Sequence, residues 1–350
     1  MHMTIAQRLR PFSHVSGTPF ILPGTSLRFQ IFPASIQVYD LALAGSPLIQ
    51  HLLLDVKGPV RDFTVTQDLE QPSLHVWGKT AEGYLRYRIG AVPGTTNRFL
   101  IKTEKFSGGG MLIPELEGVL AYPRLPKIER LSFGCHKKLD WVLMHRRQNF
   151  EEILPVWFQL GQLTPGFRTA GHPNHNGSFL SECAKEIEQG NVAAILPNFY
   201  NLYLTSFEGG LCPHANGAQF LGFSKPHGEE EHPLSLLTEG ASLIRRICIE
   251  DEGERIALLP ALPQELHAGR FLNVQCKNGA VLDVEWSKKQ IRRVMLKTGG
   301  KDHLLQLQVQ KGLKQFRLRE APNAQGKRVF CGAPLALKAN SIYYFDRFEK

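Results

Sequence analysis

The hydrophobic period of the chain changes twice, and this change limits the possible folds more than any other feature. Apolar residues alternate with polar ones from about residue 18 to 125, recur at helical intervals from 131 to 252, and alternate again after that. Alternation places side chains on the two faces of a strand, whereas a spacing of three to four residues places them on one stripe of a helix. The sequence therefore predicts three domains, residues 1–130, 131–252 and 253–350.

Short strand patterns follow one another in the first domain without helical segments between them. They recur at intervals of roughly 10 residues and are separated by turn-forming Pro-Gly, Glu-Gly and Gly-Gly pairs. This arrangement is typical of an antiparallel β-sandwich, in which each strand buries one face. The patterns are SLRFQIF, SIQVYDL, DFTVTQD, SLHVWG, YLRYRIG and RFLIKTE.

The middle domain carries apolar residues at helical spacing. Leu139, Val142 and Leu143 begin one such stripe, and further apolar stripes follow up to residue 252. Gly190 is placed where one of these helices would end, because glycine readily adopts the left-handed backbone of a helix C-terminus. We therefore expect a mostly helical domain.

The stretch RIALLPALPQELHAG, from Arg255 to Gly269, separates the helical domain from the last one. Each of its two Leu-Pro pairs fixes the proline φ and favours extended backbone in the preceding leucine, so the stretch cannot continue a helix. Alternation then returns, and Asn278-Gly279 predicts a tight hairpin turn between two strands. We expect a rigid joint followed by a C-terminal β-sandwich.

The composition is that of a soluble folded protein. Of 350 residues, 43% are hydrophobic and 21% are charged. No apolar run approaches the ~18 residues that cross a bilayer, and the first residues lack the apolar stretch of a signal peptide. Six cysteines occur without a CxxC pair or a dense framework. These features predict a cytoplasmic protein with reduced thiols and no membrane partner.

The net charge of +9 suggests an acidic partner, including nucleic acid. The basic residues, however, are spread along the chain. In KKQIRR (288–293) and KGLKQFRLR (311–319) they interleave with apolar residues, as on the solvated face of a sheet. Solvated strand faces are the favoured interpretation, and association with nucleic acid is the less favoured alternative.

Two stretches on either side of Gly269 read EGERIALLPALP (252–263) and NGAVLDVEWSKKQIRRV (278–294). They resemble glycoside hydrolase family 95, the α-L-fucosidases, in which a helix ends, an LLPALP segment crosses over, and a strand pair with a VD-x-x-W core follows. The resemblance covers about fifty residues in detail and the remainder by domain order. It implies an (α/α)6 barrel between β-domains and hydrolysis of a glycosidic bond.

The sequence departs from this family in two respects. Residues 131–252 have room for about half of the twelve helices in such a barrel, so we expect a partial, truncated barrel. Ser235 stands at the place of the catalytic Asp in the family's IDGN motif. Because a hydroxyl without an adjacent base cannot accept a proton as a carboxylate does, the site has either moved, for example to Glu239, or been lost.

Hydrolysis of a glycosidic bond normally requires two carboxyl groups. Glu208 precedes two glycines at the end of an apolar helix, and Glu182 lies in the first turn of another predicted helix. We predict these two as the catalytic candidates, with a capping or surface role as the alternative. Core packing is the alternative for the tryptophans in the substrate-binding set, since a Trp at helical spacing usually lies in a core. The predicted substrate-binding residues are Asp140, Trp141, Trp157, His172, His175, His214 and Glu239.

No cofactor or metal is predicted. The His and Cys residues in GHPNHNG and CPH do not have the spacing of a standard zinc site, and the motifs GxSxG, GxxxxGKS/T, HExxH and GxGxxG are absent. Three functions stay open. The first is a hydrolase of oligosaccharides or glycans, with its cleft between the helical domain and the N-terminal sandwich. The second is an inactive glycan-binding or scaffolding protein of the same fold, and the third is a basic protein associated with nucleic acid.

Overall fold

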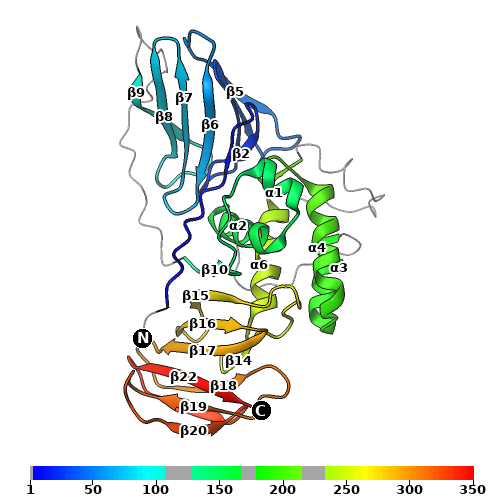
Figure 1. The fold of residues 1–350 in the computed structure, drawn as a ribbon, viewed down its shortest axis with the longest axis vertical. Coiled ribbons are helices and arrows are strands. Elements are labelled where there is room, and N and C mark those ends of the chain that lie inside the picture. The colour runs from blue at the N-terminus through cyan, green and yellow to red at the C-terminus, as the bar shows by residue number, and fades with distance from the viewer. Residues whose placement is uncertain (1–2, 107–127, 167–178, 215–232) are drawn as a thin grey trace.

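The computed structural model describes residues 3–106, 128–166, 179–214 and 233–350. Along its longest axis the molecule has three tiers, with two sheets at one end, helices in the middle and two further sheets at the other end (Figure 1). One continuous hydrophobic core runs through all three tiers. This order of sheets, helices and sheets confirms the order of elements predicted from the hydrophobic period.

Two antiparallel sheets form the first tier. The five-stranded sheet has the order β1 (Phe12–Ser13), β6 (Arg61–Asp68), β7 (Ser73–Thr80), β8 (Gly83–Ala91) and β9 (Phe99–Phe106), and the four-stranded sheet has the order β2 (Pro19–Ile21), β3 (Leu27–Phe32), β4 (Ser35–Asp40) and β5 (Leu48–Leu53). Phe29 from one sheet and Phe99 from the other meet edge to face, with ring centroids 5.1 Å apart. The inner faces of the two sheets therefore pack on each other, as the strand pattern predicts.

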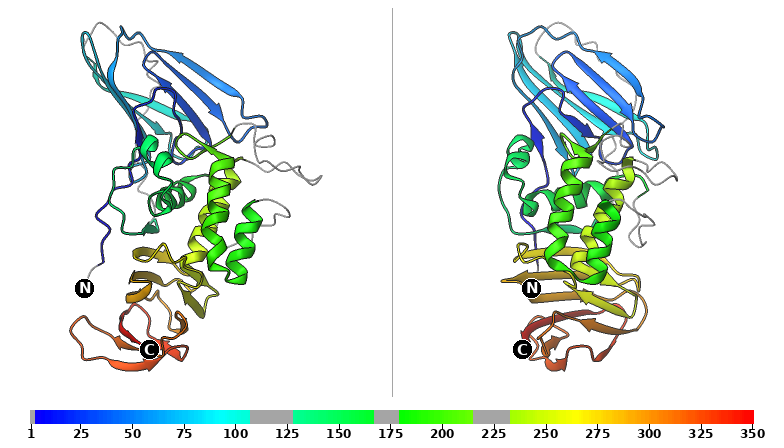
Figure 2. Two further views of the ribbon diagram at one scale, coloured as in Figure 1. Left: turned by 45° about the vertical axis from the view of Figure 1, so that its right-hand side comes forward. Right: turned by 90° about the vertical axis from the view of Figure 1, so that its right-hand side faces the viewer.

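The described residues of the middle tier contain five helices. These are α1 (Trp141–Arg147), α2 (Phe150–Leu163), α3 (Phe179–Gln189), α4 (Val192–Ser206) and α6 (Pro233–Cys248). As predicted, α3 ends before Gly190, whose φ is +66°. The expectation of a partial (α/α)6 barrel is wrong for the described residues, because these helices pack between the sheets of the outer tiers and do not close into a ring (Figure 2).

Helices α2 and α6 cross at two glycines. A Cβ atom on Gly240 would lie 2.5 Å from the Trp157 ring, and one on Gly161 would lie 2.5 Å from the carbonyl oxygen of Leu237. Both distances are shorter than any van der Waals contact, so the crossing requires glycine at both positions. This close approach places the indole of Trp157 at the centre of the core.

The last tier contains a seven-stranded and a four-stranded sheet. The seven-stranded sheet has the order β10 (Arg130–Ser132), β15 (Gly269–Gln275), β16 (Val281–Ser287), β17 (Gln290–Lys297), β22 (Ile342–Glu349), β19 (Gln315–Arg319) and β20 (Lys327–Phe330), and the other sheet has the order β13 (Ile249–Asp251), β14 (Arg255–Leu258), β18 (His303–Gln308) and β21 (Pro334–Leu337). The hairpin predicted at Asn278-Gly279 is confirmed, since it joins β15 to β16 and Gly279 has a φ of +80°.

The Leu-Pro joint packs against the C-terminus of α6. Helix α6 ends at Cys248 and the β13–β14 hairpin precedes the joint. The amide of Leu259 then donates to the Cys248 carbonyl at 2.7 Å, and that of Ala261 donates to the Ile247 carbonyl at 3.4 Å. The joint uses the carbonyls at the helix end and buries Leu259 and Ala261, so it is a packed element. It does not continue the helix, as predicted from its prolines.

The N-terminal segment connects the two outer tiers. It runs from the C-terminal sheets past the helices to the N-terminal sheets (Figure 2). Met3 packs on Leu272 and Met295 of the last tier. Further along, the carbonyl of Leu9 accepts a hydrogen bond from the amide of Leu69 in the first tier at 3.1 Å. Residues at the start of the chain therefore tie both ends of the molecule together.

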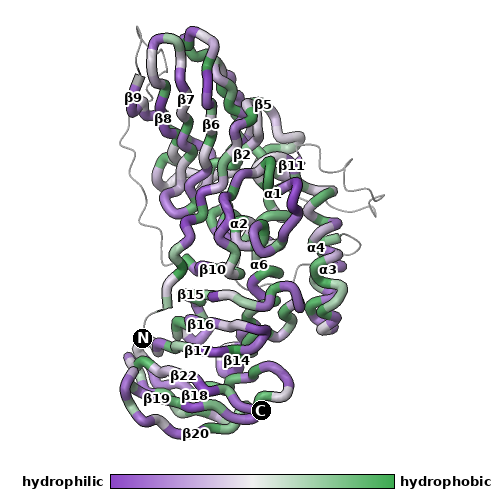
Figure 3. The backbone as a smooth tube through the Cα atoms, viewed as in Figure 1, coloured by the Kyte–Doolittle hydropathy of each residue, from purple (hydrophilic) through white to green (hydrophobic). Residues whose placement is uncertain are grey.

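Hydrophilic and hydrophobic residues alternate along the strands of both outer tiers, as Figure 3 shows. Along β7, for example, Leu74 and Val76 are buried while Trp77 and Lys79 are exposed. None of the described helices is both long enough and apolar enough to span a membrane.

Candidate functional site

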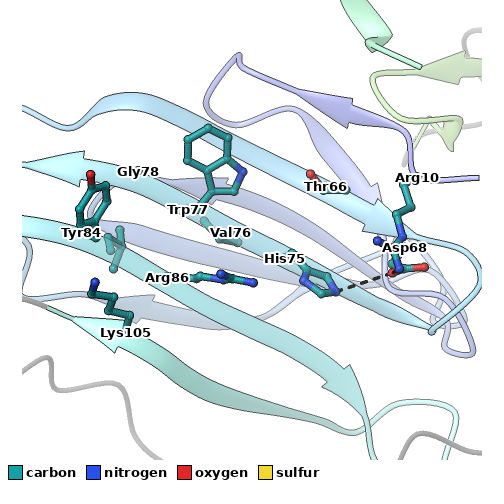
Figure 4. Close-up of a pocket in the computed structure, with 11 residues that line it drawn as sticks. Arg10, Thr66, Asp68, His75, Val76, Trp77, Gly78, Tyr84, Arg86 and Lys105 are labelled. Atoms are coloured by element: carbon teal, nitrogen blue, oxygen red, sulfur yellow. Dashed lines mark ion pairs between the residues drawn. The ribbon is translucent and has the colours of Figure 1, made fainter. Parts of the chain in front are cut away.

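A pocket lies on the outer face of the five-stranded sheet, which is the face turned away from the four-stranded sheet. Its volume is about 510 Å³. Strands β6, β7, β8 and β9 and the N-terminal segment contribute to it. The lining residues are Arg10, Thr66, Asp68, His75, Val76, Trp77, Gly78, Tyr84, Leu85, Arg86 and Lys105. Figure 4 shows two groups, with Trp77, Tyr84, Arg86 and Lys105 towards one end and His75, Asp68 and Arg10 at the other.

Two aromatic side chains stand in this pocket because of strand parity. Trp77 follows the buried Val76 and Tyr84 precedes the buried Leu85, so both rings point outwards. They are 39% and 50% exposed. In the register of β7 and β8, Trp77 is opposite Arg86 and Tyr84 is opposite Lys79, which makes the two rings diagonal neighbours. The sheet therefore presents two large apolar surfaces next to each other.

Cations surround the aromatic rings. The Lys105 ammonium lies 5.1 Å from the centre of the Tyr84 ring, within the range of a cation–π interaction. Arg86 Nε lies 2.7 Å from Glu104 Oε2, and Arg88 Nη2 lies 2.8 Å from Glu104 Oε1. One carboxylate is thus shared by two guanidinium groups, which leaves this end of the pocket positively charged.

At the other end, Asp68 is buried and its oxygens are already in use. Arg10 Nη2 lies 2.8 Å from Asp68 Oδ2, and the amides of Glu70 and Gln71 each donate to Oδ1 at 2.9 Å. His75 Nε2 lies 4.0 Å from the same carboxylate. Burial, followed by the nearby Arg88 charge, lowers the pKa of His75, so the ring is held neutral at pH 7.

This pocket is not among the sites predicted from the sequence. The signal was present in SLHVWG and YLRYRIG, where Trp77 and Tyr84 occupy outward positions of alternating strands that otherwise hold His, Lys and Arg. A large aromatic residue in the polar register of a strand is exposed once the strand pairs. Only the pairing of β7 with β8 brings the two together.

Glu208, the first catalytic candidate, lies at the junction between the helices and the four-stranded sheet. It belongs to β11 (Phe207–Glu208), which pairs with β12 (Cys212–Pro213) directly after α4. Arg28 Nη2 of β3 lies 2.7 Å from Glu208 Oε1, and the Arg28 guanidinium lies 5.2 Å from the centre of the Tyr39 ring. His214, a predicted substrate-binding residue, lies 4.0 Å from Oε2. The carboxylate is therefore engaged in a contact between two tiers.

The two glycines after Glu208 allow this close junction. A Cβ on Gly209 would lie 2.4 Å from the Pro19 ring, and one on Gly210 would lie 2.6 Å from the Phe20 ring. The amide of Gly210 donates to the Pro19 carbonyl at 2.9 Å. His145 Nε2 donates to the Gly209 carbonyl at 2.7 Å. The Glu-Gly-Gly stretch is thus accounted for by packing of the helical tier against β2.

The other acidic candidates belong to other elements than Glu208. Glu182 is exposed in the first turn of α3, and Glu239 is half-buried within α6. The Asp140 carboxylate accepts hydrogen bonds from the amides of Val142 at 2.9 Å and Leu143 at 3.4 Å, so it caps the N-terminus of α1. Among the described residues, no ion pair or hydrogen bond joins Glu182 to Glu208.

The tryptophans predicted to stack on a sugar are core residues. Trp141 is 1% exposed and Trp157 is fully buried. The two rings pack among His145, Phe199 and Phe207, so neither offers a face to a ligand. Their assignment to substrate binding is corrected to core packing, because the apolar stripe of each helix faces inwards. His172 and His175 lie outside the described residues.

No three His, Cys, Asp or Glu side chains of the described residues come together as a metal site. All six cysteines are free thiols. Burial raises the pKa of the Cys212 thiol to about 12, and that of Cys276 likewise to about 12, so both are protonated and unreactive at neutral pH.

Ser235 lies in the first turn of α6. The position matches its predicted place at the start of the helix that leads to the joint. Comparison with known proteins adds no relative, since no family model matches the chain and the search of curated proteins finds no match either.

Proposed function

We propose that this protein binds a glycan in the pocket on the outer face of the five-stranded sheet. The observation that carries the proposal is the pair of exposed rings, Trp77 and Tyr84, side by side in a concave site on a rigid sheet. Single exposed aromatic residues are common on protein surfaces, but two in one pocket mark a binding site.

Saccharides fit this chemistry. A pyranose ring has an apolar face of C–H groups and a rim of hydroxyl groups, so it needs a flat apolar surface bordered by polar side chains. Indole and phenol rings supply that surface, and each has a polar group at its edge. Thr66 and His75 add polar side chains to the rim of the pocket.

Binding without hydrolysis is the favoured form of this proposal. Two carboxyl groups must flank a scissile glycosidic bond. In the described part of the chain, Asp68 is the one carboxylate that lines the pocket, and it is buried and paired with Arg10. Glu208 is paired with Arg28 at a junction between tiers. Neither carboxylate is placed to transfer a proton to a sugar in the pocket.

Tryptophan fluorescence provides a direct test. Trp77 is 39% exposed, whereas Trp141, Trp157 and Trp286 are at most 1% exposed, so quenching by acrylamide reports on Trp77. Titration with a panel of oligosaccharides should identify a ligand that protects Trp77 from the quencher. Trp77→Ala and Tyr84→Ala should each weaken binding, measured by calorimetry, by at least about tenfold.

Phe330→Ala is the matched control. Phe330 is an aromatic residue that is 71% exposed on β20, at the other end of the molecule. Its removal should leave the affinity unchanged. If no saccharide protects Trp77, or if the Phe330 variant loses as much affinity as the Trp77 variant, the pocket is not a glycan site.

A further inference from the structure

The polar groups of the pocket are mostly hydrogen-bond donors. Among the described residues of the lining, Arg10, Arg86 and Lys105 are cations and Asp68 is the one anion, which gives three positive charges and one negative charge. Asp68 Oδ1 accepts from two backbone amides, and Asp68 Oδ2 is buried, accepts no hydrogen bond within the protein and forms an ion pair with Arg10. A ligand therefore meets unused donors, and it must supply the acceptors.

Two pairs of like charges face each other across strands next to the aromatic rings. Arg86 is directly opposite Lys105, and Arg88 is directly opposite Lys102, in the register of β8 and β9. Such pairs are destabilising in a sheet. Glu104 is the carboxylate that lies between them, and it contacts both arginines. Counted over these five described residues, four cations and one anion carry a net charge of +3.

Lys105 is the cation best placed to contact a ligand. Among the described residues, no carboxylate lies within ion-pair distance of its ammonium group, which instead lies over the Tyr84 ring. It is exposed at the same end of the pocket as Arg86 and Trp77 (Figure 4). A sugar stacked on the rings would therefore have its rim beside Lys105 and Arg86.

We infer that the glycan bound here is acidic, with a carboxylate or sulfate group held between Arg86 and Lys105. This inference rests on the proposed function and names its ligand class. An anionic group would relieve the like-charge pairing and would accept charge-assisted hydrogen bonds, which are stronger and shorter than neutral ones. A neutral sugar would leave Lys105 without an anionic partner, and Arg86 would share the single carboxylate of Glu104 with Arg88.

Single-stranded nucleic acid also combines negative charge with rings that stack. Such ligands follow a continuous basic groove with several stacking positions along it. Here the aromatic residues are two diagonal neighbours on β7 and β8, and the excess cations lie on β8 and β9 beside them. A compact pocket of this kind favours a saccharide, and an oligonucleotide is included in the test.

The test compares matched oligosaccharides on the full chain. The probes are a tetrasaccharide of galacturonic acid, the same tetrasaccharide with its carboxyl groups reduced to alcohols, and a sulfated galactose tetrasaccharide. Binding is measured by calorimetry and by protection of Trp77 from acrylamide. We expect at least one acidic probe to bind about tenfold or more tighter than the reduced probe, as one charge-assisted contact provides.

Lys105→Gln and Arg86→Gln remove the charge and keep a polar side chain. Each should remove most of the difference in affinity between the acidic and the neutral probes. Lys311→Gln, an exposed lysine in the last tier, is the matched control and should change neither affinity. Thermal melts of each variant confirm that the fold is intact.

The outcomes separate the two proposals. The tighter of the uronate and sulfate probes identifies the acid group. Equal binding of acidic and reduced probes, or no effect of Lys105→Gln, overturns the acidic ligand and leaves glycan binding in place. Failure of every saccharide to protect Trp77 overturns glycan binding itself. Tighter binding of a ten-nucleotide thymidine strand, with the same dependence on Trp77 and Lys105, overturns the saccharide in favour of nucleic acid.

Discussion

Two regions of the molecule contain similar side chains but differ in how these are paired. They are the outer face of the five-stranded sheet and the junction around Glu208, between the helices and β3. Each has at least one arginine, at least one histidine, an acidic residue and aromatic rings. At the junction, Glu208 pairs with Arg28 at 2.7 Å and the stretch after it packs on β2. On the outer sheet face, Trp77 and Tyr84 are open to solvent, and the Lys105 ammonium lies over the Tyr84 ring with no carboxylate of the described residues beside it.

Residue type alone therefore does not identify a catalytic or binding site. A carboxylate beside two glycines suggests catalysis when read from the sequence, but in the structure its charge is balanced by a neighbouring tier. Aromatic residues in a strand suggest core, but outward parity leaves them available to a ligand. Polar groups bound within the protein support the fold, and groups without such partners can bind something else. Four measurements test this difference between the two regions.

The largest effect is expected at the junction of the helices with the C-terminal sheet. Arg245 of α6 and Glu129 are both buried and form an ion pair at 2.9 Å, and Glu129 also accepts from the amide of Gln275 at 2.8 Å. Arg245→Met should lower the free energy of unfolding in urea by about 3–5 kcal/mol, because it leaves a buried carboxylate without its partner.

Arg246→Met provides the control for this loss. The neighbouring Arg246 pairs with Glu188, which is half-exposed, so its removal should cost about 1 kcal/mol or less. Similar losses for both variants would mean that the buried pair is not a structural contact between tiers.

The second prediction concerns the close approach at Gly210. Gly210→Ala should lower the unfolding free energy by about 1–3 kcal/mol, because the added methyl group would overlap the Phe20 ring. Gly300→Ala is the control, since a Cβ there meets nothing within 4 Å, and its effect should stay within about 0.5 kcal/mol. An Ala at 210 without cost would show that the helical tier does not pack tightly on β2.

Glu208→Gln should have a smaller effect. Glu208 is about one-third exposed, so loss of its pair with Arg28 should cost about 1 kcal/mol or less. Glu182→Gln, in the exposed first turn of α3, should cost about 0.5 kcal/mol. Neither change should alter glycan binding. If Glu208→Gln instead abolishes release of reducing sugar from a substrate that the unchanged protein cleaves, Glu208 is catalytic and the comparison fails.

The smallest effect concerns pH. Burial and the Arg88 charge lower the pKa of His75 in the folded protein from its ordinary value of 6.5. As the pH falls below 6.5, the unfolded chain therefore binds a proton at His75 more readily than the folded protein does. His75 therefore makes stability decrease between pH 7 and pH 5. His75→Gln should make this decrease less steep, as measured by urea unfolding at each pH. An unchanged pH dependence would place His75 in a more solvated environment than the pocket provides.

Sequence reasoning predicted the local elements well. Period-two alternation predicted the strands of both outer tiers, Asn278-Gly279 predicted the β15–β16 hairpin, and Gly190 predicted the end of α3. These features depend on backbone preferences and on side-chain parity within one segment. The same reasoning predicted the Leu-Pro joint as a rigid break after the helices.

It predicted the helical tier and the site less well. Trp141 and Trp157 fit either a core or a ligand surface by spacing alone, and their burial depends on which helix faces which sheet. Glu208 fits either a catalytic acid or an ion pair, and Arg28 is 180 positions away in the chain. The outward positions of Trp77 and Tyr84 can be predicted from the alternation of their strands, but the pocket forms only where β6 to β9 pair.

By itself, the sequence determined which segments are strands, helices and turns, because those choices follow from neighbouring residues and from the direction each side chain takes. Tertiary structure decided which charges are balanced and which aromatic rings remain open. Those properties depend on contacts between segments far apart in the chain, as between Arg28 and Glu208 or between Arg245 and Glu129. The free energy of a polar group depends on its partners and its burial, and only the assembled fold specifies both.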